Sequence, residues 1–257
     1  MTGRDDDGAF LPLGLQAGRD HADRDASLAR EEGDPGPTEW GGGEVGVGPW
    51  PGGPGAWPDD PRLDPELLAS GDRRNVVDRY RYWRREAIVA DLDARRHPFH
   101  VAIENLRHDA NIGTVVRTAN AFLAAAVHIV GRRRWNRRGA MVTDRYQHVV
   151  HHAGVADLAA WARAEGLTVV AVENGPGALP LETTELPRRC VLLFGQEGPG
   201  LTPEAAAAAD VVVSIAQFGS TRSINAGVAA GIAMHAWIRQ HAVRRPAAGG
   251  SGRSAGR

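Results

Sequence analysis

Three short motifs contain the polar residues of this 257-residue chain whose types and spacing could do chemistry. The first, residues 111–119, places an asparagine six residues before an arginine; the second, residues 194–201, surrounds a glutamate with glycines; the third is Ser223-Ile224-Asn225. An arginine binds phosphates and other anions, glycines let a ligand approach the backbone closely, and Ser and Asn side chains cap helices. Taken singly, each motif is also explained by a capped helix or a tight turn.

The elements that position these motifs follow from the hydrophobic pattern. Five apolar runs predict strands, and between them lie a helix over residues 155–163 and a short helix that begins at Pro203. The predicted strands are residues 99–103, 126–130, 167–172, 191–194 and 211–215. This alternation predicts an α/β fold with a mainly parallel sheet flanked by helices. Ligand sites in such sheets lie at the carboxyl ends of the strands, which is where the motifs fall.

The helix that follows the third motif is rich in small residues. Between Asn225 and Trp237 it contains Ala226, Gly227, Ala229, Ala230, Gly231 and Ala233. A glycine within a helix costs about 1 kcal/mol relative to alanine. We therefore expect another segment to pack very closely against this helix.

The motifs argue against two common kinds of nucleotide site. The second motif has the spacing G-x-x-G-x-G, which reverses the dinucleotide fingerprint and disfavours a nicotinamide dehydrogenase. The chain contains no lysine, and therefore no phosphate-binding loop of the G-K-S or G-K-T kind. Nucleoside triphosphate chemistry is not expected.

In this order and at these strand ends, the three motifs resemble the TrmH (SpoU) branch of the SPOUT RNA methyltransferases. The matching patterns are N-x-G-x-x-x-R-x-A, G-x-E-G-x-G, and a strand, loop, S-I-N turn and helix, within residues 99–242. The resemblance implies a C-terminal deep trefoil knot, a homodimer, and S-adenosyl-L-methionine bound among the knot loops. It also implies transfer of a methyl group to a ribose 2′-hydroxyl of tRNA or rRNA.

The resemblance also implies roles for individual residues. Cofactor contacts fall on Gly195, Gly198, Ile215, Gln217, Phe218, Gly219 and Ile224. The catalytic group comprises Arg117, Asn111, Glu197, Ser223 and Asn225. Because the ordinary pKa of arginine lies above about 12, two roles for Arg117 stay open: a base made more acidic by its site, or a group that acts electrostatically. Ala216 and Ile224 depart from the family's usual proline and leucine, but no polar group is lost and we expect activity.

The charges divide the chain into an acidic and a basic part. Residues 1–60 contain 13 acidic residues and 4 arginines, a net charge of −9, whereas the remainder has 26 arginines and 18 acidic residues, a net charge of +8. The basic part permits binding to the phosphates of a nucleic acid. Its most basic loop is predicted to bind RNA through Arg132, Arg133, Arg134, Trp135, Arg137 and Arg138.

Composition also divides the chain into segments. Residues 1–60, rich in Gly, Pro and acidic residues, predict a disordered tail, and residues 244–257 predict a second flexible tail. Residues 61–98 predict a short helical extension, with one helix over 72–96 in which arginines alternate with aromatic residues. This helix either binds RNA or packs on the main domain with a solvated basic face. The resemblance assigns residues 99–243 to a methyltransferase domain.

Partners and compartment are constrained by what the sequence lacks. Cys190 is the only cysteine, which excludes an internal disulfide. Neither a signal peptide nor a membrane-length apolar run is present, so we expect a cytoplasmic protein with no membrane partner. His148, His151 and His152 cluster without a carboxylate or cysteine at ligand spacing, so no metal is expected. Two alternatives stay open: a non-catalytic RNA-binding or assembly protein on the same fold, and a methyltransferase acting on a base nitrogen.

Overall fold

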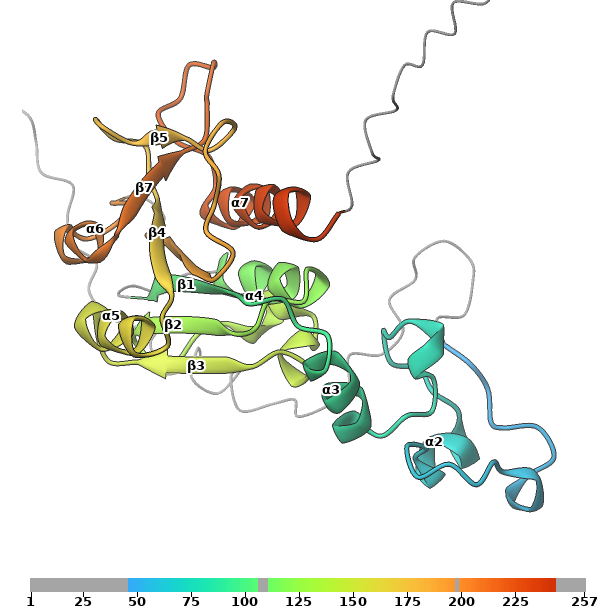
Figure 1. The fold of residues 1–257 in the computed structure, drawn as a ribbon. Coiled ribbons are helices and arrows are strands. Elements are labelled where there is room, and N and C mark those ends of the chain that lie inside the picture. The colour runs from blue at the N-terminus through green and yellow to red at the C-terminus, as the bar shows by residue number, and fades with distance from the viewer. Residues whose placement is uncertain (1–45, 106–110, 197–198, 244–257) are drawn as a thin grey trace, which may run out of the picture.

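A seven-stranded parallel sheet forms the centre of the molecule (Figure 1). The computed structural model describes residues 46–105, 111–196 and 199–243. The strands are β1 (Phe99–Asn105), β2 (Val127–Gly131), β3 (Val149–His152), β4 (Thr168–Val172), β5 (Leu179–Pro180), β6 (Cys190–Phe194) and β7 (Val211–Ser214). Their order is β3-β2-β1-β6-β4-β7-β5, and every neighbouring pair is parallel. The predicted α/β class is confirmed.

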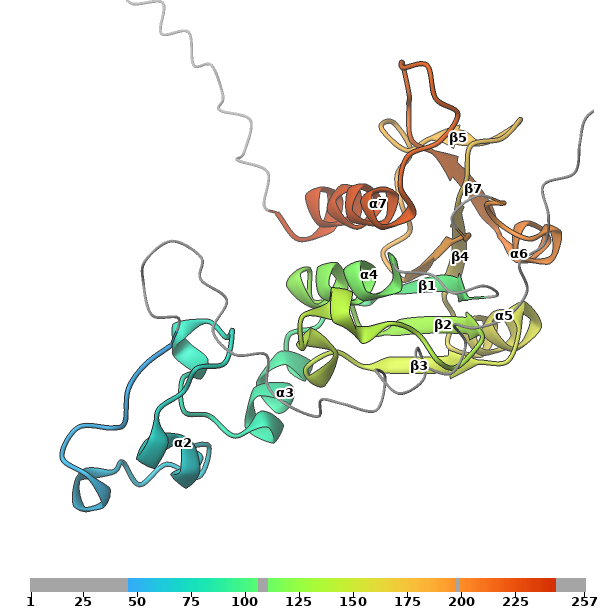
Figure 2. The same ribbon diagram turned by 180° about the vertical axis from the view of Figure 1, so that it is seen from behind.

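Helices cover both faces of this sheet (Figures 1 and 2). The α-helices are α2 (Pro65–Ser70), α3 (Arg85–Asp93), α4 (Asn111–Ala121), α5 (Val155–Ala164), α6 (Pro203–Ala208) and α7 (Ala226–His241). Short 3-10 turns are η1 (Pro54–Ala56), η2 (Asp78–Tyr80), η3 (Arg137–Ala140) and η4 (Thr143–Arg145). Helices α4 and α7 pack together on one face, and α5 and α6 cover the other. The carboxyl ends of the central strands therefore lie between the two helical layers.

The central strands are buried on both faces, which explains their unbroken apolar sequences. All five residues of β6 are buried. On the α4 and α7 side, the ring of Trp237 lies 4.5 Å from that of Phe99 at the start of β1. The Trp237 indole N–H donates to the backbone oxygen of Pro187 (3.2 Å), so this large side chain is held by both its apolar and its polar edge.

All five predicted strands are confirmed, with ends that shift by one or two residues. The hydrophobic pattern misses β3 and β5, which are the two edge strands of the sheet. β3 contains two histidines, and β5 is two residues long and includes a proline. Edge strands are not buried on both faces, so they lack the continuous apolar run that reveals the central strands.

The single helix predicted over residues 72–96 is wrong, because only α3 is α-helical there. A buried carboxylate is the cause. Asp72 is fully buried and accepts hydrogen bonds from the Arg74 guanidinium (2.9 and 2.7 Å) and from the Tyr82 backbone N–H (2.9 Å). These bonds draw residues 72–82 into a compact loop in which Tyr82 has a φ of 62°.

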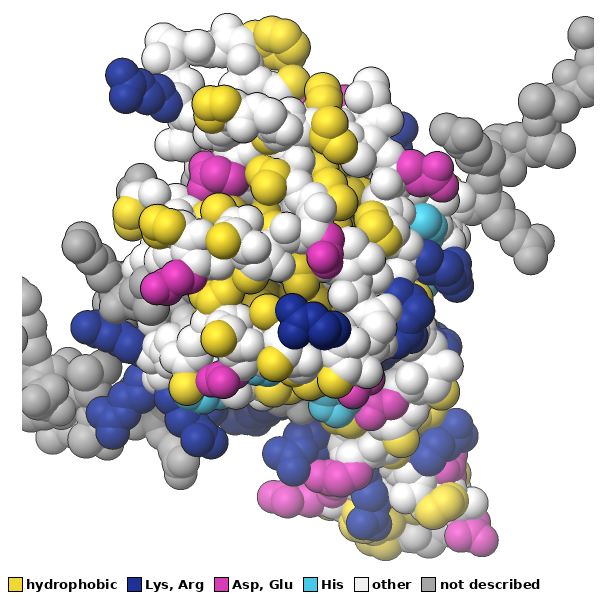
Figure 3. Space-filling view, turned by 60° about the vertical axis from the view of Figure 1, so that its left-hand side comes forward, with side chains coloured by type: hydrophobic (Ala, Val, Ile, Leu, Met, Phe, Trp, Pro, Cys, Tyr) yellow, Lys and Arg dark blue, Asp and Glu magenta, His cyan; other side chains and the backbone are white. Residues whose placement is uncertain are grey.

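The extension packs on the main domain through apolar side chains. Tyr80, Ile88 and Leu92 form a cluster that Leu123 and Tyr146 of the main domain complete. Many of its arginines face acidic neighbours, as the lower part of Figure 3 shows. The ion pairs include Arg62–Asp60, Arg79–Asp91, Arg85–Glu86 and Arg95–Asp91. These contacts support the packing interpretation of this segment, and RNA contact by it stays a prediction.

Residues 46–60, which composition assigns to a disordered tail, follow a defined path against the extension. Val47 and Asp72 exchange two backbone hydrogen bonds of 2.9 Å, and the Trp50 ring lies 5.4 Å from the Tyr82 ring. The prediction is corrected for these residues, because aromatic packing and backbone pairing hold a segment that composition alone assigns to disorder. Residues 1–45 and 244–257 lie outside the described residues. In the described ranges, no helix is long and apolar enough to cross a membrane.

Three histidines form a hydrogen-bonded chain across β1, β2 and β3. Ring nitrogens of His100 and His128 are 3.0 Å apart, those of His128 and His152 are 2.8 Å apart, and the Trp161 ring lies 4.2 Å from that of His128. Burial lowers the pKa of His128 to about 3 and that of His100 to about 4. The chain is therefore built from neutral imidazoles.

The histidines that cluster in the sequence are separated in space. His148 Nε2 lies 2.8 Å from the Asp93 carboxylate, and His151 Nε2 lies 2.7 Å from the backbone oxygen of Gly131. Of these three, His152 is the one that joins the buried chain. Within the part of the molecule that the structure describes, no group of three or more His, Cys, Asp or Glu side chains is arranged to hold a metal ion.

The histidine chain predicts acid sensitivity. In the unfolded state a histidine titrates near pH 6.5, so below that pH the unfolded chain binds protons that the folded His128 excludes. Stability from this group is complete above about pH 6.5 and falls as the pH drops, by up to about 1.4 kcal/mol per pH unit. In urea titrations between pH 6.5 and 4.5, His128→Gln should lose stability less steeply than the wild type. The exposed control His235→Gln should follow the wild-type slope, and equal slopes for all three proteins would contradict this assignment.

Candidate functional site

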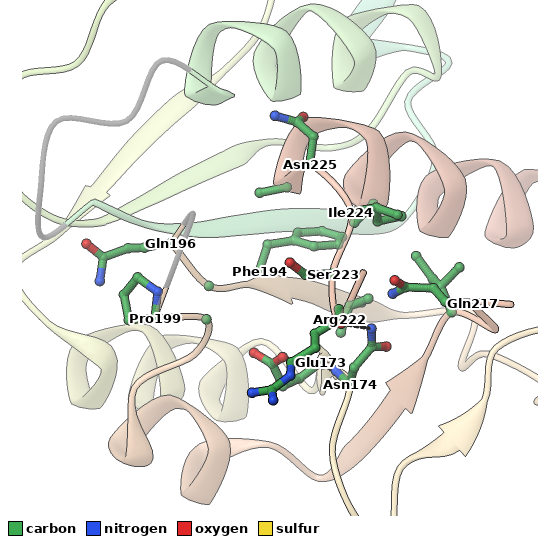
Figure 4. A pocket seen from close by; sticks show the side chains of 16 residues that line it. Glu173, Asn174, Phe194, Gln196, Pro199, Gln217, Arg222, Ser223, Ile224 and Asn225 are labelled. Carbon is green, nitrogen blue, oxygen red and sulfur yellow. Dashed lines mark hydrogen bonds between the residues drawn. The ribbon is translucent and has the colours of Figure 1, made fainter. Parts of the chain in front are cut away.

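A pocket of about 440 Å³ opens at the carboxyl ends of β4, β6 and β7, beside the N-terminus of α7 (Figure 4). It is lined by Val172, Glu173, Asn174, Phe194, Gly195, Gln196, Pro199, Gly200, Ile215, Gln217, Arg222, Ser223, Ile224, Asn225, Ala226 and Ala229. Its walls therefore combine the second and third sequence motifs. A volume of this size is typical of small-molecule sites.

Most of the predicted cofactor residues line this pocket. Gly195, Ile215, Gln217 and Ile224 do so, as do Ser223 and Asn225 of the predicted catalytic group. Phe218 and Gly219 belong to the same loop but are not among the lining residues, and the Phe218 side chain is 97% exposed. Glu197 and Gly198 lie outside the described residues. The fold thus brings the loop after β6 and the loop after β7 to one cavity.

The glycines of the second motif allow a turn that no larger residue would fit. A Cβ on Gly195 would lie 2.2 Å from the carbonyl carbon of Gly200 and 2.3 Å from the Leu201 nitrogen. Gln196 and Gly200 exchange two backbone hydrogen bonds (3.1 and 3.2 Å), and Gly200 has a φ of 74°. Close backbone approach therefore explains both glycines, and it forms one wall of the pocket.

Two carboxylates, from the strands on either side of β6, bind the segment of this loop that follows Gly200. Glu104, 1% exposed at the end of β1, accepts hydrogen bonds from the backbone N–H (2.9 Å) and the hydroxyl (2.7 Å) of Thr202. Glu173, directly after β4, accepts one from the backbone N–H of Leu201 (2.9 Å). The loop is therefore tied to strand ends on both of its sides.

Asn225 joins the third motif to the first. Its side-chain oxygen caps α7 by accepting from the N–H groups of Gly227 (2.9 Å) and Val228 (3.2 Å), while its amide nitrogen donates to the side-chain oxygen of Asn111 (2.9 Å). The predicted capping role of Asn225 is confirmed. A Cβ on Gly227 would lie 3.2 Å from Thr114 Cγ2, so the expected close packing occurs against α4.

Arg117 lies on α4, two turns after Asn111. Its side chain is exposed and does not line the pocket. Among the residues that the structure describes, none forms an ion pair or hydrogen bond with its guanidinium. An exposed guanidinium with no carboxylate beside it is available to an anion from outside the protein.

The basic loop after β2 is anchored beside α4. The buried amide nitrogen of Asn105 donates to the backbone oxygens of Arg132 (2.7 Å) and Arg134 (2.9 Å). The predicted RNA-binding arginines Arg132, Arg133, Arg134, Arg137 and Arg138 are exposed. Trp135 is half-buried and packs against the core, with Arg137 5.9 Å from its ring. Part of the Trp135 side chain therefore packs against the core, and only the remaining part is accessible to a ligand.

A family model described as the SpoU rRNA Methylase family matches residues 98–235, which is more than half of the chain. The chain belongs to this family. The match includes all three motifs, and the TrmH/SpoU resemblance of the sequence is confirmed. As a member of the SpoU family, the chain brings its first and third motifs together through the contact of Asn111 with Asn225, and its second and third motifs together at the pocket.

The relatives of this SpoU-family chain have the names of RNA methyltransferases. The tRNA (guanosine(18)-2′-O)-methyltransferase of Escherichia coli (strain K12) is 29% identical over 160 residues, which cover 61% of this chain and 70% of the relative. An uncharacterized tRNA/rRNA methyltransferase of Mycobacterium bovis (strain BCG / Pasteur 1173P2) is 34% identical over 158 residues, which cover 57% of this chain and 46% of the relative. The share of each relative that is matched thus differs widely.

Two solved structures show the same fold. The AdoMet-bound rRNA methyltransferase from Sinorhizobium meliloti superposes with a TM-score of 0.52 at 28% identity, over 60% of this chain and 60% of that chain. The A. aeolicus TrmH/SpoU tRNA-modifying enzyme superposes with a TM-score of 0.54 at 19% identity, over 61% of this chain and 81% of that chain. Each superposition thus covers about three fifths of this chain.

Sequence reasoning misses Glu104, Asn105 and Glu173, although each holds a loop of the site. Glu104 and Glu173 directly follow a predicted apolar strand, and Asn105 comes one residue after Glu104. Because ligand sites lie at carboxyl ends of parallel strands, a polar residue at such an end is the signal that could have found them.

Alanine substitutions at two helical glycines should change the free energy of unfolding in opposite directions. A Cβ on Gly113 of α4 would lie 2.6 Å from Gly139 Cα, whereas one on Gly231 of α7 would have Thr118 Cγ2 at 3.9 Å as its nearest neighbour. Gly113→Ala should therefore lower the free energy of unfolding by about 1 to 3 kcal/mol. Gly231→Ala should raise it by about 1 kcal/mol. Urea denaturation measures both, and a stable Gly113→Ala variant would contradict the close packing of α4 on η3.

Proposed function

We propose that this chain is an S-adenosylmethionine-dependent methyltransferase that modifies a ribose 2′-hydroxyl of tRNA or rRNA. The observation that carries the proposal is the Asn111–Asn225 hydrogen bond, which links the pocket to the helix that bears the exposed Arg117. Membership of the SpoU family supports RNA methyl transfer, and the E. coli relative, a 2′-O-methyltransferase, supports the 2′-hydroxyl.

The pocket residues fit S-adenosylmethionine. The tight glycine turn leaves backbone without side chains at the pocket wall, which an adenine ring could approach, and Ile215 and Ile224 supply apolar surface on the other loop. Gly195 and Gln217 would contact the nucleoside. When bound, the cofactor supplies an electrophilic methyl group on a sulfonium. The Sinorhizobium meliloti rRNA methyltransferase, whose crystal structure contains bound AdoMet, supports this ligand.

Arg117 acts electrostatically in this proposal. Its guanidinium is exposed and free of carboxylate partners in the described structure, which suits a group that binds an RNA phosphate and stabilises a developing alkoxide. Asn111 and Asn225 orient the two helix ends between which the hydroxyl is held. Alignment of the two reactants contributes on the order of 7 to 11 kcal/mol to such transfers, so positioning is the main task of these side chains.

A homodimer and a knot, both implied by the family resemblance, belong to the proposal. α7 and its preceding loop expose four apolar side chains: Phe218, Ile224, Val228 and Ile232. A second copy of the chain could cover them. Two hydrogen bonds join α7 to the segment before β6. The Leu186 N–H donates to the side-chain oxygen of Gln240 (2.8 Å), and the Gln240 amide nitrogen donates to the backbone oxygen of Thr184 (3.0 Å). These contacts between α7 and an earlier segment support the proposed knot.

The basic loop supplies the RNA contact in the proposal. Four of its arginines are exposed without an ion pair in the described structure: Arg132, Arg133, Arg134 and Arg138. Because Asn105 and the Gly113–Gly139 contact fix this loop against α4, phosphates bound there lie on the same side of the molecule as Arg117.

Replacement of Arg117 separates chemistry from cofactor binding. Arg117→Ala should lower methyl transfer to RNA by about a hundredfold or more, because the charge that stabilises the nucleophile is lost. Its affinity for S-adenosylmethionine, measured by calorimetry, should match that of the wild type. The control Arg163→Ala removes an exposed arginine from α5, on the other helical layer, and should leave both quantities unchanged. Loss of cofactor binding in Arg117→Ala would assign the residue to the pocket instead.

A further inference from the structure

The pocket contains a carboxylate without an ion-pair partner among the described residues. Glu173 and Arg222 are the charged side chains among its described lining residues. Neither forms an ion pair with any residue that the structure describes. Figure 4 places Glu173 among the side chains that surround the cavity. Its negative charge is therefore available to a ligand.

Backbone groups fix this carboxylate in the wall. One oxygen of Glu173 accepts from the Leu201 N–H (2.9 Å), and the other accepts from the N–H of Asn174 (3.0 Å). The backbone of Gly200 lies so close that a Cβ there would be 2.5 Å from a Glu173 oxygen. Each oxygen keeps a second lone pair, and the side chain cannot turn away from the pocket without breaking these contacts.

The proposed cofactor and its product differ by one positive charge. S-adenosylmethionine carries a sulfonium, an ammonium and a carboxylate, whereas S-adenosylhomocysteine has lost the sulfonium charge with the methyl group. A fixed negative charge attracts the first ligand more strongly than the second. Arg222, the other charged lining residue, could pair with the amino-acid carboxylate, which both ligands keep, so it would not discriminate between them.

We propose that Glu173 is a specificity-determining residue that favours the charged methyl donor over the neutral-sulfur product. The inference rests on the proposed function, since it assumes that this pocket binds S-adenosylmethionine. Its consequence is that loss of the methyl group weakens the attraction of the ligand to the pocket wall, which assists product release after each transfer.

Calorimetric titration of the full chain tests this role without any measurement of activity. The ligands are S-adenosylmethionine, S-adenosylhomocysteine and sinefungin, an analogue in which a protonated amine keeps the positive charge. Glu173→Gln should weaken binding of the two cationic ligands by roughly three- to tenfold and that of S-adenosylhomocysteine by less than about twofold. The control Glu165→Gln, at the exposed end of α5, should change none of the three affinities.

The pattern across ligands separates charge from structure. Glutamine also loses one backbone acceptor, so a purely structural role for Glu173 would weaken all three ligands by the same factor. That result would overturn the inference while leaving the proposed function intact. A wild-type protein that binds neither S-adenosylmethionine nor S-adenosylhomocysteine would instead overturn the proposed function, and this inference with it.

Discussion

The side chain of Asn225 is the contact on which the site depends. Its oxygen caps α7 through two backbone N–H groups, and its nitrogen donates to Asn111 at the start of α4. An amide carries an acceptor and donors on one short side chain, whereas an aspartate would cap the helix without donating to Asn111. This bond fixes the two helix N-termini relative to each other. It thereby relates the pocket at α7 to Arg117 on α4.

The loops around that contact take their shape from the ends of the strands. Glu104 holds Thr202, Glu173 holds Leu201, and Asn105 holds the basic loop, in each case by side-chain bonds to backbone groups of another segment. A parallel sheet brings its carboxyl ends to one edge, so polar residues there reach loops that are distant in sequence. The conformations of the site's loops consequently depend on the strand ends as well as on the loops' own glycines and caps.

The sequence was sufficient for the central strands, the helices around the motifs and the two motif loops that line the pocket. Full burial on both faces leaves long apolar runs, and the glycine turn and the S-I-N cap use residue types with few alternatives. It was insufficient for the edge strands and for the segment from Asp72 to Tyr82. There the conformation comes from one buried carboxylate that binds groups two and ten residues away, which overrides the helical spacing of the side chains. Glu104 and Glu173 were missed because their partners become neighbours only after the sheet has formed.

The most direct test is methyl transfer from labelled S-adenosylmethionine to total tRNA and to rRNA, each purified from a strain that lacks this protein, followed by alkaline hydrolysis. A methyl group on the 2′-oxygen blocks cleavage of the adjacent phosphodiester. The account predicts label in one of the two RNA pools, recovered in dinucleotides that resist alkali. Label in neither pool, from a protein that binds S-adenosylmethionine, would contradict the proposed activity, and label recovered only in mononucleotides would place the methyl group on a base.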